Sequence, residues 1–131
     1  MRLFDSHCHL QDSRITDLEA ALQRASERGV EHIVCSSVNE HDWDQVTAIA
    51  RKFPGVIPSY CIHPMYSDDR SPDWLDKLEQ ILIENPMACI GETGLDRWEK
   101  TQDDQDQLSI FIDQLMLAKK LNRPKLVLYP D

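Results

Sequence analysis

Two histidines one residue apart, close to the amino terminus, are the first residues of this sequence that could do chemistry. They lie in FDSHCHL, residues 4–10, directly after a short apolar run and an aspartate. In an extended segment successive side chains point to opposite faces, so His7 and His9 share one face and Cys8 takes the other. Two neighbouring imidazoles make half of a metal site, and we expect both to be ligands.

A carboxylate and a third histidine follow later apolar segments and could join that pair. Glu92 lies in IGETGLD, where Gly91 and Gly94 let the backbone approach closely and carry the carboxylate into a crowded site. His63 precedes proline in CIHP, which holds it in an extended conformation, and we expect it at the rim of the pocket. The alternatives are a glutamate in a solvated turn and a histidine that satisfies a loop hydrogen bond. A mixed imidazole and carboxylate set suits zinc, manganese or iron and does not identify which.

The loop after Glu92 contains a cation and an aromatic residue side by side. Arg97 and Trp98 follow the GLD segment directly. A guanidinium and an exposed ring in this position could contact a phosphate or a base. The alternative is that both side chains pack within the loop.

The composition indicates one globular domain and excludes several classes of function. The chain has 131 residues, 41% of them hydrophobic, a formal net charge of −9 and a pI near 4.9. An acidic protein repels phosphates on average, so DNA would have to be held by local cations or by bound metal. The apolar stretches are far shorter than the ~20 residues that span a bilayer, which gives no support for a membrane role.

The cysteines indicate a reducing environment. They are scattered without a CxxC pair, and no secretory signal opens the chain. We therefore expect a cytoplasmic protein in which free thiols fill strand space as small apolar groups: Cys8, Cys35, Cys61 and Cys89.

Apolar segments predict five strands, and apolar residues at helical spacing predict a helix after each of the first four. The strands are expected at 2–6, 30–36, 56–61, 87–91 and 125–129. Ser71, followed by Pro72 and Asp73, predicts the start of the third helix with the serine as its cap. The fourth and longest helix is expected to bury an apolar stripe: Leu108, Phe111, Ile112, Leu115, Ala118 and Leu121.

Strands that alternate with helices are typical of an α/β domain with a parallel sheet, here a single domain over residues 1–131. About four and a half βα units can form an open doubly wound sheet or the first half of a (β/α)8 TIM barrel, which needs about 250 residues. The topology alone does not separate these. His7, His9, His63 and Glu92 all follow strands, and this favours the barrel, where chemistry gathers at the carboxyl ends of the strands.

Four motifs in order resemble one known family. DSHCHL, IHP, IGETGLD and QLMLAKKLNRP, spread from Asp5 to Pro124, resemble the signatures of the TatD-type metal-dependent hydrolases, deoxyribonuclease-like members of the amidohydrolase-type barrels. The resemblance implies a (β/α)8 barrel with a divalent metal centre (Mg, Mn or Zn) that hydrolyses phosphodiester bonds in DNA. It also implies site roles for individual residues: His7 and His9 as metal ligands, Glu92 as the carboxylate that joins or bridges the metals, and His63 and Asp96 as pocket residues.

The sequence departs from that family in two places. Cys61 stands where the family has glycine before the HP motif, and Leu128 stands where its fifth strand carries a histidine ligand. The ligands of the second half-barrel have no counterpart, so we expect a truncated domain that is impaired or inactive by itself. Two other hypotheses are a half-barrel that is non-catalytic, binds metal weakly or self-associates through its exposed edge, and an amidohydrolase-like enzyme for another small ester or amide.

Overall fold

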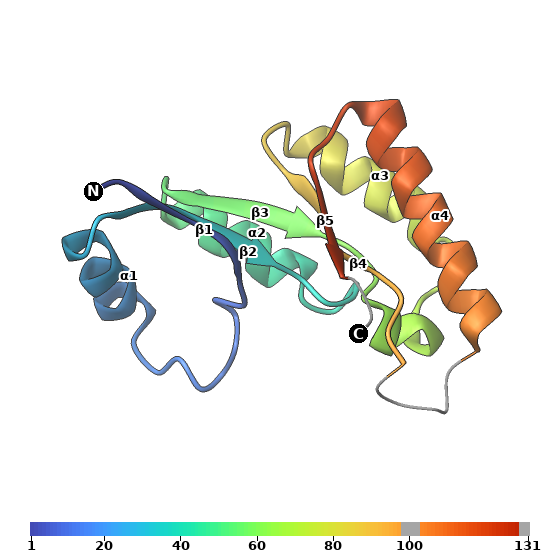
Figure 1. Cartoon of the computed structure of the whole chain (residues 1–131), viewed down its shortest axis with the longest axis horizontal. Coiled ribbons are helices and arrows are strands. Elements are labelled where there is room, and N and C mark those ends of the chain that lie inside the picture. The colour runs from blue at the N-terminus through green and yellow to red at the C-terminus, as the bar shows by residue number, and fades with distance from the viewer. Residues whose placement is uncertain (98–102, 129–131) are drawn as a thin grey trace.

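The computed structural model describes residues 1–97 and 103–128, and its five strands form one parallel sheet (Figure 1). The strand order follows the chain: β1 (Leu3–Cys8), β2 (Val30–Ser36), β3 (Val56–Tyr60), β4 (Cys89–Gly94) and β5 (Lys125–Leu128). Because neighbouring parallel strands follow one another in sequence, right-handed crossovers place every helix on the same face of the sheet. The sheet therefore curls into a half-barrel, which confirms the predicted fold and excludes the doubly wound alternative.

Four helices and one short 3-10 helix connect the strands. They are α1 (Leu18–Glu27), α2 (Trp43–Lys52), η1 (Pro64–Asp69), α3 (Trp74–Glu84) and α4 (Asp104–Leu121). Asp17 and Asp103 cap α1 and α4, because their carboxylates accept hydrogen bonds from backbone amides of the first turns. Within the described part of the chain, none of the helices has the length and apolar character needed to cross a membrane.

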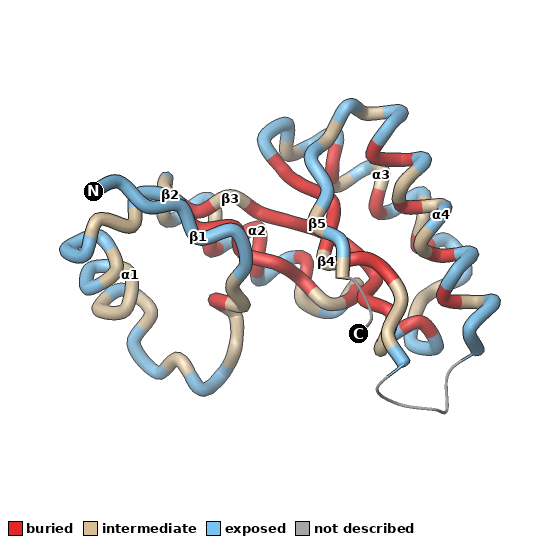
Figure 2. Tube along the Cα trace, viewed as in Figure 1, coloured by how far each residue is buried: buried red, intermediate tan, exposed pale blue. Residues whose placement is uncertain are grey.

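The hydrophobic core lies between the helices and the convex face of the sheet. Figure 2 shows buried segments concentrated along β2, β3 and β4, whereas β1 and β5 at the two ends of the strand order are largely exposed. Fully buried side chains come from both layers: Val46, Tyr60, Leu78, Leu82 and Ile90. The core is thus built around the middle of the sheet.

Three local predictions need correction or extension. β1 runs to Cys8 rather than stopping at Ser6, so His7 lies inside the strand. β4 runs to Gly94 rather than Gly91, so Glu92 also lies inside its strand. The predicted serine cap of α3 is wrong: the Ser71 hydroxyl lies 2.5 Å from Glu40 Oε1, and the helix begins at Trp74. The last predicted strand residue, Tyr129, lies outside the described residues.

The predicted buried face of α4 is also largely wrong. Leu108 and Ile112 are 44% and 48% exposed, whereas Gln107 and Gln114 on another face are 3% and 0% exposed. Ala118 alone of the predicted stripe is fully buried. The buried side carries Ile110, Leu117 and Ala118 together with the two glutamines, and the helix contacts β4, η1 and α3.

Candidate metal centre

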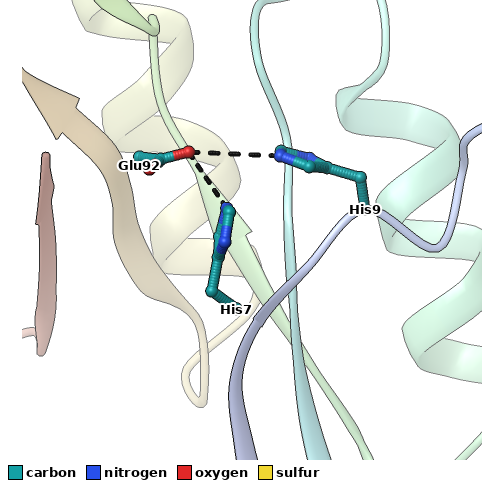
Figure 3. Close-up of side chains that lie close together, drawn as sticks. All are labelled: His7, His9 and Glu92. Carbon is teal, nitrogen blue, oxygen red and sulfur yellow. Dashed lines mark ion pairs between the residues drawn. The ribbon is translucent and has the colours of Figure 1, made fainter.

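His7, His9 and Glu92 come from opposite parts of the sheet and meet at one end of it. His7 lies near the end of β1, His9 directly follows that strand, and Glu92 lies in β4. The carboxyl ends of parallel strands lie at the same edge of a sheet, and curvature of the sheet brings β1 toward β4. The side chains point toward one another in the close-up of Figure 3.

The distances among these three side chains place their potential ligand atoms close to one another. Glu92 Oε2 lies 3.0 Å from His7 Nε2 and 4.0 Å from His9 Nε2 (Figure 3). The two imidazole rings are 4.8 Å apart between centroids in an edge-to-face arrangement. One ligand atom from each residue lies within 4.8 Å of the others, which is close enough for all three to contact a single ion between them.

A backbone carbonyl orients His9. Its Nδ1 lies 2.8 Å from the carbonyl oxygen of Ser36, at the end of β2. A carbonyl can only accept a hydrogen bond, so Nδ1 carries the proton and the lone pair of neutral His9 is on Nε2. That nitrogen is the one that faces Glu92, and its lone pair is therefore available to a metal ion.

His63 has the opposite arrangement of its ring nitrogens. Its Nδ1 accepts a hydrogen bond from the Met65 amide at 3.1 Å, so the proton of the neutral ring is on Nε2, which lies 3.8 Å from Glu92 Oε2. Burial lowers the pKa of His63, although the charges of Glu92 and Asp96 oppose this effect. In this form the residue is a hydrogen-bond donor at the edge of the site and has no lone pair facing inward.

Two glycines bring Glu92 close to the next strand. Gly91 has a φ of +142°, and a Cβ atom there would lie 2.6 Å from the Leu126 carbonyl oxygen. A Cβ atom at Gly94 would likewise overlap the Leu128 carbonyl oxygen. Only glycine tolerates such contacts, so the predicted close approach of backbone around Glu92 is present in the structure.

The remaining predicted residues lie around this cluster. Asp96 is half-buried and its amide donates to Gln107 Oε1 at 3.0 Å. Arg97 is exposed, and its guanidinium lies 3.8 Å from an Asp104 carboxylate oxygen at the start of α4. Trp98 lies outside the described residues. Leu128, where the resemblance places a histidine, pairs with Gly94 across β4 and β5 and offers only hydrocarbon.

The cysteines pack as neutral thiols. All four are free, and three are buried. Burial raises the pKa of Cys35 to about 11 and raises that of Cys61 well above the ordinary value. Thiols in this state are protonated near neutral pH and are poor metal ligands. The cysteines thus have the space-filling role predicted for them.

Sequence reasoning missed three groups that support the site. One is the Ser36 carbonyl, which no sequence pattern reveals because every residue has a carbonyl. The others are Gln107 and Gln114, the buried polar residues of α4. Their only sequence signal is a spacing of seven residues, which places them on one face of a helix.

A divalent ion fits the donor set of these residues. Two neutral imidazoles and one carboxylate are common ligands of zinc, manganese and iron, and the orientation of His9 by Ser36 is the kind of outer contact that metal-binding histidines have. Among the described residues, His7, His9 and Glu92 are the group of potential ligands close enough to hold an ion.

Comparison with known proteins gives consistent matches over nearly the whole chain. The model of the family described as TatD related DNase matches residues 4–127. The chain is 30% identical, over 94% of its length, to the uncharacterized metal-dependent hydrolase YjjV of Escherichia coli K12. It is 31% identical, over 92% of its length, to the putative deoxyribonuclease tatdn3 of Danio rerio, and 30% identical, over 93%, to human deoxyribonuclease TATDN3.

A solved structure agrees with the sequence matches. The crystal structure of YjjV, a TatD homolog from E. coli K12, is similar with a TM-score of 0.90 and 29% identity, and the similarity covers 96% of this chain and 50% of that one. The chain spans about half the length of the curated relatives that it matches, 49% of YjjV and 50% of tatdn3.

Proposed function

We propose, from the fact that this chain belongs to the TatD related DNase family, that His7, His9 and Glu92 hold a divalent metal ion for the hydrolysis of phosphodiester bonds in DNA. The family is one of metal-dependent hydrolases, and relatives of this chain are named as deoxyribonucleases. The observation that carries the proposal is the convergence of three potential ligand atoms within 4.8 Å, contributed by β1, by the residue that follows it and by β4.

The charge of the protein supports a metal in this role. With a formal net charge of −9, the chain repels a phosphodiester, and a cation held at the site offsets that repulsion locally. A divalent ion supplies Lewis-acid chemistry, because it polarises a phosphoryl oxygen and lowers the pKa of water. The four free cysteines fit a reducing, cytoplasmic setting, which is part of this proposal.

The side chains of the site have separate tasks in this proposal. His7, His9 and Glu92 bind the ion, and the Ser36 carbonyl keeps the Nε2 lone pair of His9 directed at it. His63 presents an N–H group at the rim, where it can donate a hydrogen bond to a phosphate oxygen of the substrate. No described side chain is assigned as the general base, so we expect slow turnover by this chain alone.

A nuclease assay on single-stranded DNA tests the proposal directly. We expect cleavage that needs added Mn²⁺ or Mg²⁺, stops with EDTA and is lost in His7→Ala and Glu92→Ala. His32→Ala is the matched control, because His32 lies near the amino-terminal end of β2, whereas the site lies at the carboxyl-terminal ends of the strands. Cleavage that survives both ligand substitutions would contradict the proposal, as would hydrolysis of a simple carboxylic ester with no action on DNA.

A second proposal concerns the two ends of the sheet, where we propose that two copies of this chain associate. β1 and β5 end the strand order, so each has a side with backbone groups that no described strand pairs. Apolar side chains are exposed beside both, with Phe4 56% and Val127 49% exposed. All five strands are parallel, so β5 of one copy can pair with β1 of another in the same direction, and a twofold axis closes the contact.

Light scattering coupled to size exclusion tests this association. We expect a dimer at micromolar concentration, and we expect Val127→Lys to shift it to monomer because a charge on an edge strand opposes pairing. Ile83→Lys is the matched control, since Ile83 is 58% exposed on α3 and lies on neither edge strand. A wild-type chain that stays monomeric across the concentration range would exclude self-association.

A further inference from the structure

Two glutamines on α4 are buried although the helix has exposed leucine and isoleucine residues. Gln107 is 3% and Gln114 is 0% exposed, whereas Leu108 and Ile112 are 44% and 48% exposed. A spacing of seven residues puts the two amides on the same face, two turns apart. Burial of an amide is unfavourable unless its donors and acceptor are paired. The hydrogen-bond partners of the two glutamines therefore show which segments this face of the helix connects.

Gln114 joins the segment that carries His63 to the strand that carries Glu92. Its Oε1 accepts a hydrogen bond from the Ile62 amide at 2.9 Å, and its Nε2 donates to the Ile62 carbonyl at 3.1 Å. The same Nε2 donates to Thr93 Oγ1 at 2.8 Å. Ile62 precedes His63 and Thr93 follows Glu92, so one amide contacts the immediate neighbours of both site residues.

Gln107 makes an equivalent connection two turns earlier in the helix. Its Nε2 donates to the Pro64 carbonyl at 3.3 Å, and its Oε1 accepts from the Asp96 amide at 3.0 Å. Pro64 follows His63 directly. The two glutamines therefore contact the chain on both sides of His63 and on the carboxyl-terminal side of Glu92.

The sheet itself does not provide this connection. The ladder between β3 and β4 pairs Ser59 with Cys89 and Tyr60 with Ile90, and these are its last paired residues. Beyond that point, glutamine side chains from α4 bond backbone groups of the two segments. The side-chain amides of Gln107 and Gln114 thus connect the chain after β3 to residues of and after β4, beyond the last paired residues of the ladder.

We propose that Gln107 and Gln114 are positioning residues that set the distance between His63 and Glu92. The role in metal binding rests on the function proposed above, whereas the positioning itself does not. Neither glutamine touches the ligand atoms. They act through the backbone of residues 62–64 and 93–96, and loss of either amide lets these two segments separate.

The test uses Gln114→Met and Gln107→Met, because methionine has a similar volume and no amide. In the metal-free protein we expect faster hydrogen exchange at the Ile62 amide in the first variant and at the Asp96 amide in the second. We also expect a changed 15N shift of the His63 ring, which reports its surroundings. The dissociation constant for Mn²⁺, measured by calorimetry, should rise about tenfold or more, as for lost outer contacts of metal ligands.

Two controls separate positioning from general loss of stability. Gln105→Met changes an exposed glutamine of the same helix and should alter none of these quantities. Leu78→Ala removes a fully buried core side chain and should lower the unfolding temperature with the Mn²⁺ affinity and the His63 ring shift unchanged. If Gln114→Met does not fold, Gln107→Met tests the same proposal through the hydrogen bonds of Gln107 to the Pro64 carbonyl and the Asp96 amide.

Failure of the positioning role can be distinguished from failure of the proposed metal-dependent function. A wild-type chain that binds no Mn²⁺ would remove the metal centre, yet amide exchange and the His63 shift would still report positioning. Unchanged exchange and an unchanged ring shift in both glutamine variants would overturn the inference. Equal loss of Mn²⁺ affinity in Leu78→Ala would also overturn it, because general destabilisation would then explain the effect.

Discussion

The rim that carries the site and the lateral ends of the sheet differ in how completely their groups are covered. At the rim, Glu92 has three histidine partners within 4.0 Å. The Ser36 carbonyl accepts a hydrogen bond from His9, and two buried glutamines bond the surrounding backbone. At the ends, β1 and β5 leave Phe4 and Val127 about half exposed. Figure 2 shows that β4 is largely buried and that β1 is largely exposed. The described strands and helices therefore contain the groups that position the three candidate ligands, whereas β1 and β5 at the two ends of the sheet are more exposed.

The largest expected effect comes from removing the carboxylate at the rim of the sheet. Glu92→Ala removes the carboxylate between the histidines, and we expect its Mn²⁺ dissociation constant to rise by more than about a hundredfold, beyond what loss of an outer contact costs. Isothermal titration calorimetry measures this. His32→Ala should bind as the wild type does, and equal binding by the Glu92 variant would show that the ion sits elsewhere.

The next effect compares a covered with an uncovered apolar side chain. Leu78 is fully buried, and Leu78→Ala should lower the free energy of unfolding by about 2–5 kcal/mol through lost contacts and a cavity. Ile112 is 48% exposed on α4, and Ile112→Ala should change the free energy of unfolding by no more than about 0.5 kcal/mol. Urea unfolding of both variants at a fixed protein concentration measures the difference. A large loss from Ile112→Ala would mean that this side of α4 is covered in solution.

The smallest effect concerns two thiols that face each other in the ladder, Cys8 of β1 and Cys35 of β2. Burial raises the pKa of Cys35 from 9.0 to about 11, so between these pH values the unfolded chain loses a proton that the folded chain keeps. Stability therefore falls as pH rises through this window. Cys35→Ala should make the pH dependence of the unfolding free energy shallower by up to about 1.4 kcal/mol per pH unit.

Cys8 provides the matched comparison at the sheet edge. Burial and the nearby charge of Asp5 also raise its pKa, but the residue is only half-buried. Cys8→Ala should therefore flatten the alkaline fall in stability less than Cys35→Ala does. Denaturant titrations at several pH values from 8 upward measure both slopes. A larger effect from Cys8 would indicate that the edge of β1 is covered in solution.

Much of the fold and of the candidate site was predictable because it depends on local sequence patterns. The spacing of His7 and His9 on an extended segment and the glycines around Glu92 are local properties, and parallel strands then bring these residues to the same rim. The motifs from Asp5 to Pro124 predicted the family, which the match over residues 4–127 confirms. The wrong predictions were the serine cap at Ser71 and the buried face of α4, where a distant glutamate and neighbouring segments compete with the local pattern.

The sequence alone indicated which residues could bind a metal ion and at which end of the strands their side chains gather, whereas the order of the strands came from the folded sheet. The sequence did not reveal which nitrogen of His9 and of His63 faces Glu92 or which side of α4 is buried, and the folded structure shows both. The physical reason is that hydrogen bonds to backbone groups of distant segments set these features: the Ser36 carbonyl, the Met65 amide and the backbone of Ile62. Backbone groups are the same at nearly every residue, so no pattern of side chains announces which of them will be a partner.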